Sequence, residues 1–120
     1  LGTPVLELPM TVLRLPGRTL PVAGGGPFRA TPQPLFRGAL RRVNALGRRG
    51  IFYFHPWEID PDQPRVPGLS LAKRFKHFTG LRRMAPRLSA LLHEFAWARM
   101  DEVFAAELAS PGASLPLAAE

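Results

Sequence analysis

The sequence predicts an α/β fold, because a helical pattern is followed directly by a strand pattern. Apolar residues at spacings of one, three and four between residues 35 and 46 predict an amphipathic helix, which Gly47 ends. The β-branched and aromatic run at 51–54 predicts a short buried strand, which Pro56 stops one residue after His55. A helix that leads through a short turn into a strand is the repeating step of α/β folds.

The N-terminal third predicts less regular structure. Two extended runs, 5–8 and 10–15, are separated by Pro9, which cannot donate to a β-ladder, so we expect one interrupted strand. Proline and glycine recur from 16 to 34, which predicts a long loop without a regular element. The triglycine 24–26 lacks the spacing of a nucleotide-binding loop, and the sequence does not predict a helix directly after it. It is a structural loop or a loop that lines a substrate site.

The C-terminal half predicts helices. A basic amphipathic stretch at 70–78 begins with a serine that can cap it. Pro86 is expected at the start of a second helix with an apolar stripe. Asp101 can cap a third helix at 102–108. The Ser, Pro, Gly and Ala residues at 109–120 predict a disordered tail.

Length and composition limit the functional classes. The 120 residues form one domain or part of one, and the start at Leu1 rather than Met suggests a fragment of a longer protein. The first ten residues do not have the pattern of a secretory signal, and no apolar run is long enough to predict a transmembrane segment. The absence of cysteine excludes disulfides and thiolate metal sites.

The charge distribution is uneven. Sixteen Lys and Arg residues against nine Asp and Glu residues give a net charge of +7. Between Gln63 and His93 all the charged residues are basic, namely Arg65, Lys73, Arg74, Lys76, Arg82, Arg83 and Arg87. This stretch is either the solvated surface of an Arg-rich protein or a face that binds an anionic partner.

His55 is the strongest candidate for chemistry, since ligand crevices of α/β folds lie at the carboxyl ends of strands. The carboxylates of Glu58, Asp60 and Asp62 follow closely, and a neighbouring carboxylate can adapt an imidazole to general acid or base catalysis. The alternative is a hydrogen-bonded core histidine.

The same three carboxylates could bind a hard cation, or the loop could cap itself and form a salt bridge to Arg65 or to the basic face. The other two histidines, His77 and His93, are expected at the surface. The spacing of the histidines matches no local metal-binding motif.

Three runs of the sequence carry a resemblance to a known family: 20–29 with the triglycine, 52–65 with the Phe-His-Pro-Trp-Glu motif, and 74–81. Together they resemble the C-terminal part of polysaccharide deacetylases, in the subgroup associated with exosortase and PEP-CTERM exopolysaccharide loci. The resemblance covers residues 5–104. It implies a carbohydrate esterase with a distorted (β/α) barrel.

The resemblance also implies domains and partners. Residues 1–68 would be the terminal strands and helix of the barrel, and 69–108 a helical extension, followed by the tail at 109–120. In this family an Asp-His-His set binds a divalent metal, usually zinc, and a further Asp acts as the base. Those residues lie in N-terminal motifs absent from this sequence, so the metal ligands are expected in a missing N-terminal part of the same enzyme.

The resemblance assigns roles to individual residues. His55 matches the general acid that protonates the departing amine, and Phe52 matches the apolar wall around the acetyl methyl group. The remaining substrate-binding candidates are Trp57, Gly25, Gly26, Phe28 and Arg29. Trp57 could stack on a sugar ring or pack the loop. Pro27 departs from the pattern, because the subgroup usually has an aromatic residue after the three glycines.

The expected function is therefore that of a segment of a polysaccharide deacetylase, inactive alone, which acts on N-acetyl groups of an exopolysaccharide or chitin-like sugar. Nucleic acid is not an expected partner in this interpretation. Two alternatives stay open: a non-catalytic basic module that binds acidic polysaccharide or nucleic acid, and an incomplete chain that does not fold alone. The sequence leaves the compartment open between bacterial cytoplasm and cell envelope.

Overall fold

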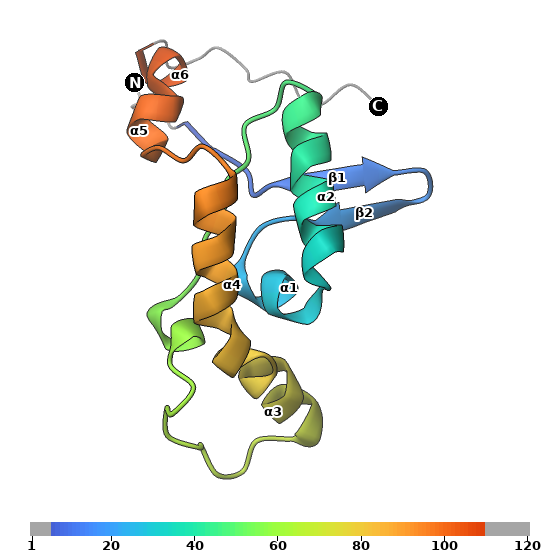
Figure 1. The fold of residues 1–120 in the computed structure, drawn as a ribbon, viewed down its shortest axis with the longest axis vertical. Helices are drawn as coiled ribbons and strands as arrows, with labels where there is room; N and C mark the ends of the chain where they lie inside the picture. The colour runs from blue at the N-terminus through green and yellow to red at the C-terminus, as the bar shows by residue number, and fades with distance from the viewer. Residues whose placement is uncertain (1–5, 110–120) are drawn as a thin grey trace, which may run out of the picture.

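The computed structural model describes residues 6–109, which form a mixed α/β arrangement of one hairpin and several helices (Figure 1). The elements in chain order are β1 (Val12–Leu15), β2 (Arg18–Pro21), α1 (Gly25–Ala30), α2 (Gln33–Ala45), the 3₁₀ helix η1 (Pro56–Ile59), α3 (Leu71–Phe78), α4 (Leu81–Glu94), α5 (Met100–Val103) and α6 (Ala105–Ala109). The hairpin is the only sheet in this part of the chain, and no barrel is present within it. None of the helices described here is long and apolar enough to cross a membrane.

The hairpin replaces the interrupted strand expected at 5–15. β1 and β2 pair antiparallel, with Val12 opposite Pro21 and Leu15 opposite Arg18. Because Pro21 is the last residue of β2, its missing N–H leaves the rest of the ladder intact. The strands lie against α2, and the turn between them extends beyond that helix (Figure 1).

The prediction of a long loop at 16–34 is also wrong, because this segment forms β2 and the helix α1. The second and third glycines of the triglycine and Pro27 form the first turn of α1. Backbone N–H groups of a first helical turn have no intrahelical acceptor, so proline costs nothing there. The triglycine therefore opens a helix.

The core lies between β1, α1, α2 and α4. Phe28 of α1 is fully buried, and its ring meets those of Phe36 and Phe52 edge-on at centroid distances of 4.9 and 5.3 Å. The buried cluster comprises Leu13, Val22, Phe28, Phe36, Leu40, Val43, Met84, Leu88 and Leu91. Helix α2 supplies Phe36, Leu40 and Val43, as the predicted amphipathic pattern requires.

The strand predicted at 51–54 is not observed. Ile51 exchanges two hydrogen bonds with the Thr11 hydroxyl, but no residue of 51–54 joins a sheet in the described structure. Phe52 packs against the core, whereas Tyr53 and Phe54 are exposed. A strand forms only where a neighbouring strand can pair with it. In the described structure β1 and β2 pair only with each other, so residues 51–54 have no strand beside them.

The helices of the second half differ in detail from those predicted. The helix at 70–78 is confirmed as α3, with the Ser70 hydroxyl accepting from the Lys73 N–H at 3.4 Å. Helix α4 starts at Leu81 after Gly80, whose φ of 76° ends α3, so Pro86 lies inside α4 and not at its start. Pro86 cannot donate to the carbonyl four residues earlier, and because it lies on the exposed face of the helix, water can solvate that carbonyl instead.

The third helix is divided into α5 and α6, which meet at the buried Phe104. The tail predicted at 109–120 begins at the last residue of α6 and otherwise lies outside the described residues.

Candidate functional site

A cleft of about 510 Å³ lies where η1, α1 and α3 meet. Many of the predicted site residues line it: His55, Trp57, Gly25, Gly26 and Arg29. Tyr53, Lys73, Lys76 and His77 also line it. The sequence placed Lys73 and Lys76 in the basic stretch that could bind an anion, but it gave Tyr53 and His77 no role in a site. We call this hollow the His55 cleft.

His55 is held at the start of η1. Its backbone N–H donates to Glu58 Oε2 at 2.9 Å, and its carbonyl accepts from the Glu58 N–H at 2.9 Å. The imidazole itself is exposed and lies beside the rings of Tyr53 and Trp57. This exposure leaves the imidazole open to a ligand. The core-histidine alternative is therefore wrong.

Trp57 is half-buried and packs between imidazoles. Its ring stacks on His77 at a centroid distance of 4.2 Å and an angle of 12°, and it lies nearly parallel to His55 at 5.8 Å. The face that His77 covers cannot stack on a sugar. Trp57 therefore packs the loop and contributes its remaining surface to the His55 cleft.

His77 is more than the surface residue that the sequence predicted. It is half-buried, and its Nε2 lies 2.9 Å from Gln63 Oε1, which ties α3 to the loop after η1. His77 follows Lys73 by four residues on α3, so both face the same side of the helix. That spacing was the available signal for placing them in one cleft.

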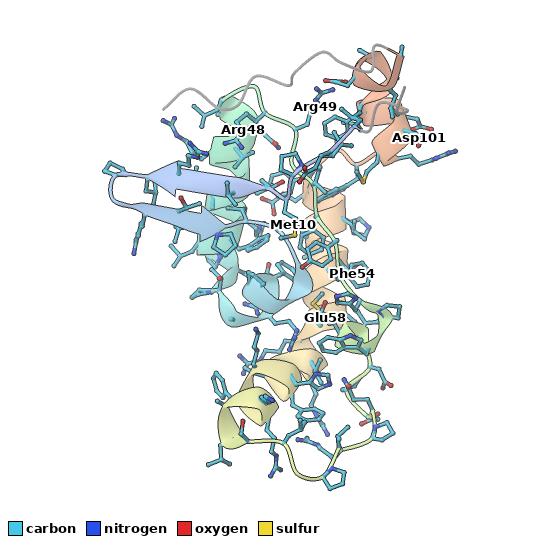
Figure 2. The ribbon with its side chains drawn as sticks, turned by 180° about the vertical axis from the view of Figure 1, so that it is seen from behind. Met10, Arg48, Arg49, Phe54, Glu58 and Asp101 are labelled. Atoms are coloured by element: carbon cyan, nitrogen blue, oxygen red, sulfur yellow. The ribbon has the colours of Figure 1, made fainter. Side chains whose placement is uncertain are left out.

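Arg29 and Glu58 form a buried ion pair beneath the cleft. Arg29 Nη2 lies 3.0 Å from Glu58 Oε1, and both side chains are 3% exposed. Arg29 Nη1 also donates to the carbonyls of His77 and Thr79, at 3.1 and 2.5 Å. Figure 2 shows Glu58 where η1 lies against α4. Arg29 was predicted to bind substrate, but its guanidinium is occupied by these contacts.

The salt bridge expected between the acidic loop and Arg65 is also corrected. The buried carboxylate pairs with Arg29, and the Arg65 guanidinium instead lies 4.4 Å from the centroid of the Phe78 ring. The expected self-capping of the loop is observed, because Asp60 Oδ1 accepts from the Asp62 N–H at 3.0 Å.

The glycines explain how close α1 approaches η1. A Cβ on Gly25 would overlap the Glu58 carboxylate, whereas a Cβ on Gly26 would meet nothing within 4 Å. Gly24 has a φ of 86° and would place a Cβ 3.1 Å from the Tyr53 ring. The glycines at 24 and 25 therefore serve close packing, while Gly26 faces open space.

The two predicted phenylalanines do not line the His55 cleft. Phe28 is fully buried and cannot contact a substrate. Phe52 is half-buried and packs against Phe28 and Trp97, with a centroid distance of 6.2 Å to the latter. The prediction that Phe28 binds substrate is therefore wrong, because its side chain is buried.

A divalent metal does not fit the donor set of this part of the chain. Among residues 6–109 no group of three or more His, Asp or Glu side chains converges as metal ligands would. Glu58 is committed to Arg29, and His77 is paired with Gln63. We derive no chemical step through a metal bound by these residues.

Comparison with known protein families gives a match over most of the chain. The model of a family described as "Domain of unknown function (DUF3473)" matches residues 2–105. No curated protein and no solved structure matches the chain significantly.

Proposed function

The chain belongs to this DUF3473 family, and on that premise we propose that it is the C-terminal segment of a metal-dependent polysaccharide deacetylase. Domains of this family are known to accompany polysaccharide deacetylase-like proteins. In the complete enzyme the segment adjoins a (β/α) barrel that supplies the metal site and the base. Its substrate carries N-acetyl groups, as an exopolysaccharide or a chitin-like sugar does.

The observation that carries the proposal is the exposed imidazole of His55 in an aromatic cleft. Hydrolysis of an acetamide adds water across the C–N bond and yields acetate and an amine. The amine nitrogen needs a proton as the C–N bond breaks, and an imidazolium can donate it near neutral pH. The two hydrogen bonds between His55 and Glu58 fix the backbone that carries this ring.

Acetate release from N-acetylated chito-oligosaccharides tests the proposal. The 120-residue chain with added zinc should release none, because it provides neither the base nor the metal ligands. In the complete enzyme, His55→Ala should lower kcat by about 10²- to 10⁴-fold, the usual contribution of a general acid, with unchanged metal content. His93→Ala is the matched control, since His93 is exposed on α4 and lies outside the cleft.

Two results would contradict the proposal. Clear turnover by the 120-residue chain would show that it is not a dependent segment. A near-normal rate for the His55→Ala enzyme would remove His55 from the acid role.

A further inference from the structure

A second, larger hollow of about 1190 Å³ adjoins the His55 cleft. It lies between the end of α1, the loop near Pro61 and Arg65, and the junction of α3 with α4. Figure 1 shows α3 and the start of α4 below α1. Gly26, Pro27, Arg29 and Lys76 line both hollows, so the two share a wall.

The lining of the larger hollow is strongly basic. Besides Arg29, which is neutralised by Glu58, five cations line it: Arg65, Lys76, Arg82, Arg83 and Arg87. No Asp or Glu belongs to the lining, and none of the five forms an ion pair with a described residue. We call this hollow the basic groove.

The cations come from separate elements that the fold holds together. Arg87 of α4 donates to the carbonyls of Arg29 and Thr31, each at 3.0 Å, and so joins α4 to the end of α1. Arg82 and Arg83 lie exposed on the first turn of the same helix. Like charges gathered without counter-charges repel one another, and an anion in the groove would relieve that repulsion.

We propose that the basic groove binds a carboxylate-bearing stretch of the same sugar polymer whose N-acetylated unit enters the His55 cleft. The identity of the polymer rests on the proposed function; the selectivity for negative charge rests on the groove. The guanidinium of Arg87 is engaged with backbone carbonyls. Three of the other four cations are arginines, and a planar guanidinium forms paired hydrogen bonds with a carboxylate. The volume exceeds the roughly 300–1,000 Å³ of pockets for single small ligands and suits several linked sugars.

The aromatic residues favour sugar acids over nucleic acid. Single-stranded nucleic acid binds on successive aromatic rings. Of the two phenylalanines that line the groove, Phe78 has the Arg65 guanidinium 4.4 Å from its ring centroid. Phe75, 72% exposed, is the remaining platform, so the groove offers charge without a row of stacking surfaces.

Binding of three probes to the 120-residue chain tests the inference: an oligogalacturonate, a neutral N-acetylglucosamine oligomer of equal length, and single-stranded DNA of similar charge. We expect the oligogalacturonate to bind most tightly, with an affinity that falls as salt rises. The double variant Arg82→Glu/Arg83→Glu should weaken this binding at least about tenfold. Arg14→Glu/Arg18→Glu makes the same charge change on the exposed hairpin and should alter affinity by less than about twofold.

Three outcomes would overturn the inference. Equal losses in the two variants would mean that net charge alone attracts the probe. Equal affinity for the neutral oligomer would remove the charge selectivity, and tighter binding of DNA would assign the groove to nucleic acid. Acetate release from a neutral substrate depends on His55 and not on these arginines, so the failure of the deacetylase proposal and the failure of this one give different results.

Discussion

At the residue scale, the buried pair of Arg29 and Glu58 connects the most distant parts of the site. Arg29 donates to the carbonyls of His77 and Thr79 and so joins α1 to the end of α3. Glu58 accepts from the backbone N–H of His55 and so fixes the backbone there. An ion pair with this much hydrogen bonding offsets the cost of burying its charges. Its loss would therefore disturb stability and the geometry of the His55 cleft together.

We predict that Glu58→Gln destabilises the chain by about 3–5 kcal/mol, because it leaves the Arg29 guanidinium buried without a counter-charge. Urea unfolding followed by circular dichroism measures the change. Asp101→Asn is the control, since it breaks the exposed pair of Asp101 and Arg99 and should cost less than about 1 kcal/mol. Equal effects of the two substitutions would contradict a structural role of the buried pair.

The triglycine gives a second prediction at this scale. Gly25→Ala forces a methyl group against the Glu58 carboxylate and should destabilise by about 1–3 kcal/mol. Gly26→Ala meets no other part of the fold within 4 Å, so it lacks this clash. Its gain in helix propensity is opposed by Pro27, which disfavours a helical residue with a Cβ before it, so the change should stay within about 1 kcal/mol. Thermal unfolding of both variants checks the difference, and a reversed order would refute the contact.

Glu107 gives a prediction about pH. The hydrogen bond from Arg49 holds the pKa of this carboxyl below its ordinary value of 4.5. Because the pKa is lowered in the folded chain, the pair stabilises the fold above the unfolded pKa, and this contribution is lost as pH falls through the folded value. An NMR titration of Glu107 should show the lowered midpoint, and Arg49→Gln should return it toward 4.5. An unchanged midpoint in Arg49→Gln would contradict the assigned cause.

At the element scale, local patterns predicted the helices better than the strands. The periodicity of α2 and the serine cap of α3 are local signals, and both elements form where expected. Two proline residues led to wrong predictions. Pro27 favoured a loop where the short helix α1 forms, and Pro86 was expected at the start of a helix but lies inside α4, on its exposed face. The strand expected at 51–54 depended on a neighbour far away in sequence, which composition and periodicity do not identify.

The site was predicted in part for the same reason. His55 and Trp57 belong to one recognisable motif, and Gly25 and Gly26 belong to another; the His55 cleft contains all four. The pairing of Arg29 with Glu58 spans 29 residues, and His77 reaches Trp57 across a loop. Such contacts depend on how α1, η1 and α3 pack, which local spacing does not encode.

Helix α3 gives the prediction at this scale. It buries none of its residues, so its stability depends on its own ends and on the contacts of His77. Ser70→Ala should cost about 0.5–1 kcal/mol locally, through loss of the cap. Hydrogen exchange should accelerate in α3 while α4 keeps its protection. Ser89→Ala, exposed within α4, is the control and should leave α3 unchanged.

At the scale of the whole molecule, one small core holds an extended arrangement together. The radius of gyration is 16.8 Å, against about 14 Å for a compact domain of this length. The buried cluster joins the hairpin, α1, α2 and α4, whereas α3 and the loop before it lie below it and contribute nothing to it (Figure 1). Stability is therefore concentrated where the hairpin, α1, α2 and α4 pack together. Both hollows lie where this packed part meets α3.

The last prediction follows from this concentration. Phe28 is fully buried in the core and packs against the rings of Phe36 and Phe52, and Phe28→Ala should cost about 3–5 kcal/mol, a large fraction of the stability of a small domain. We expect loss of near-ultraviolet circular dichroism and of NMR chemical-shift dispersion at 37 °C. Phe28→Leu keeps most of the volume and should stay folded, and Phe75→Ala removes an equally large but exposed ring at little cost. If Phe28→Ala remained folded and lost only polymer binding, Phe28 would be a ligand contact and not the centre of the core.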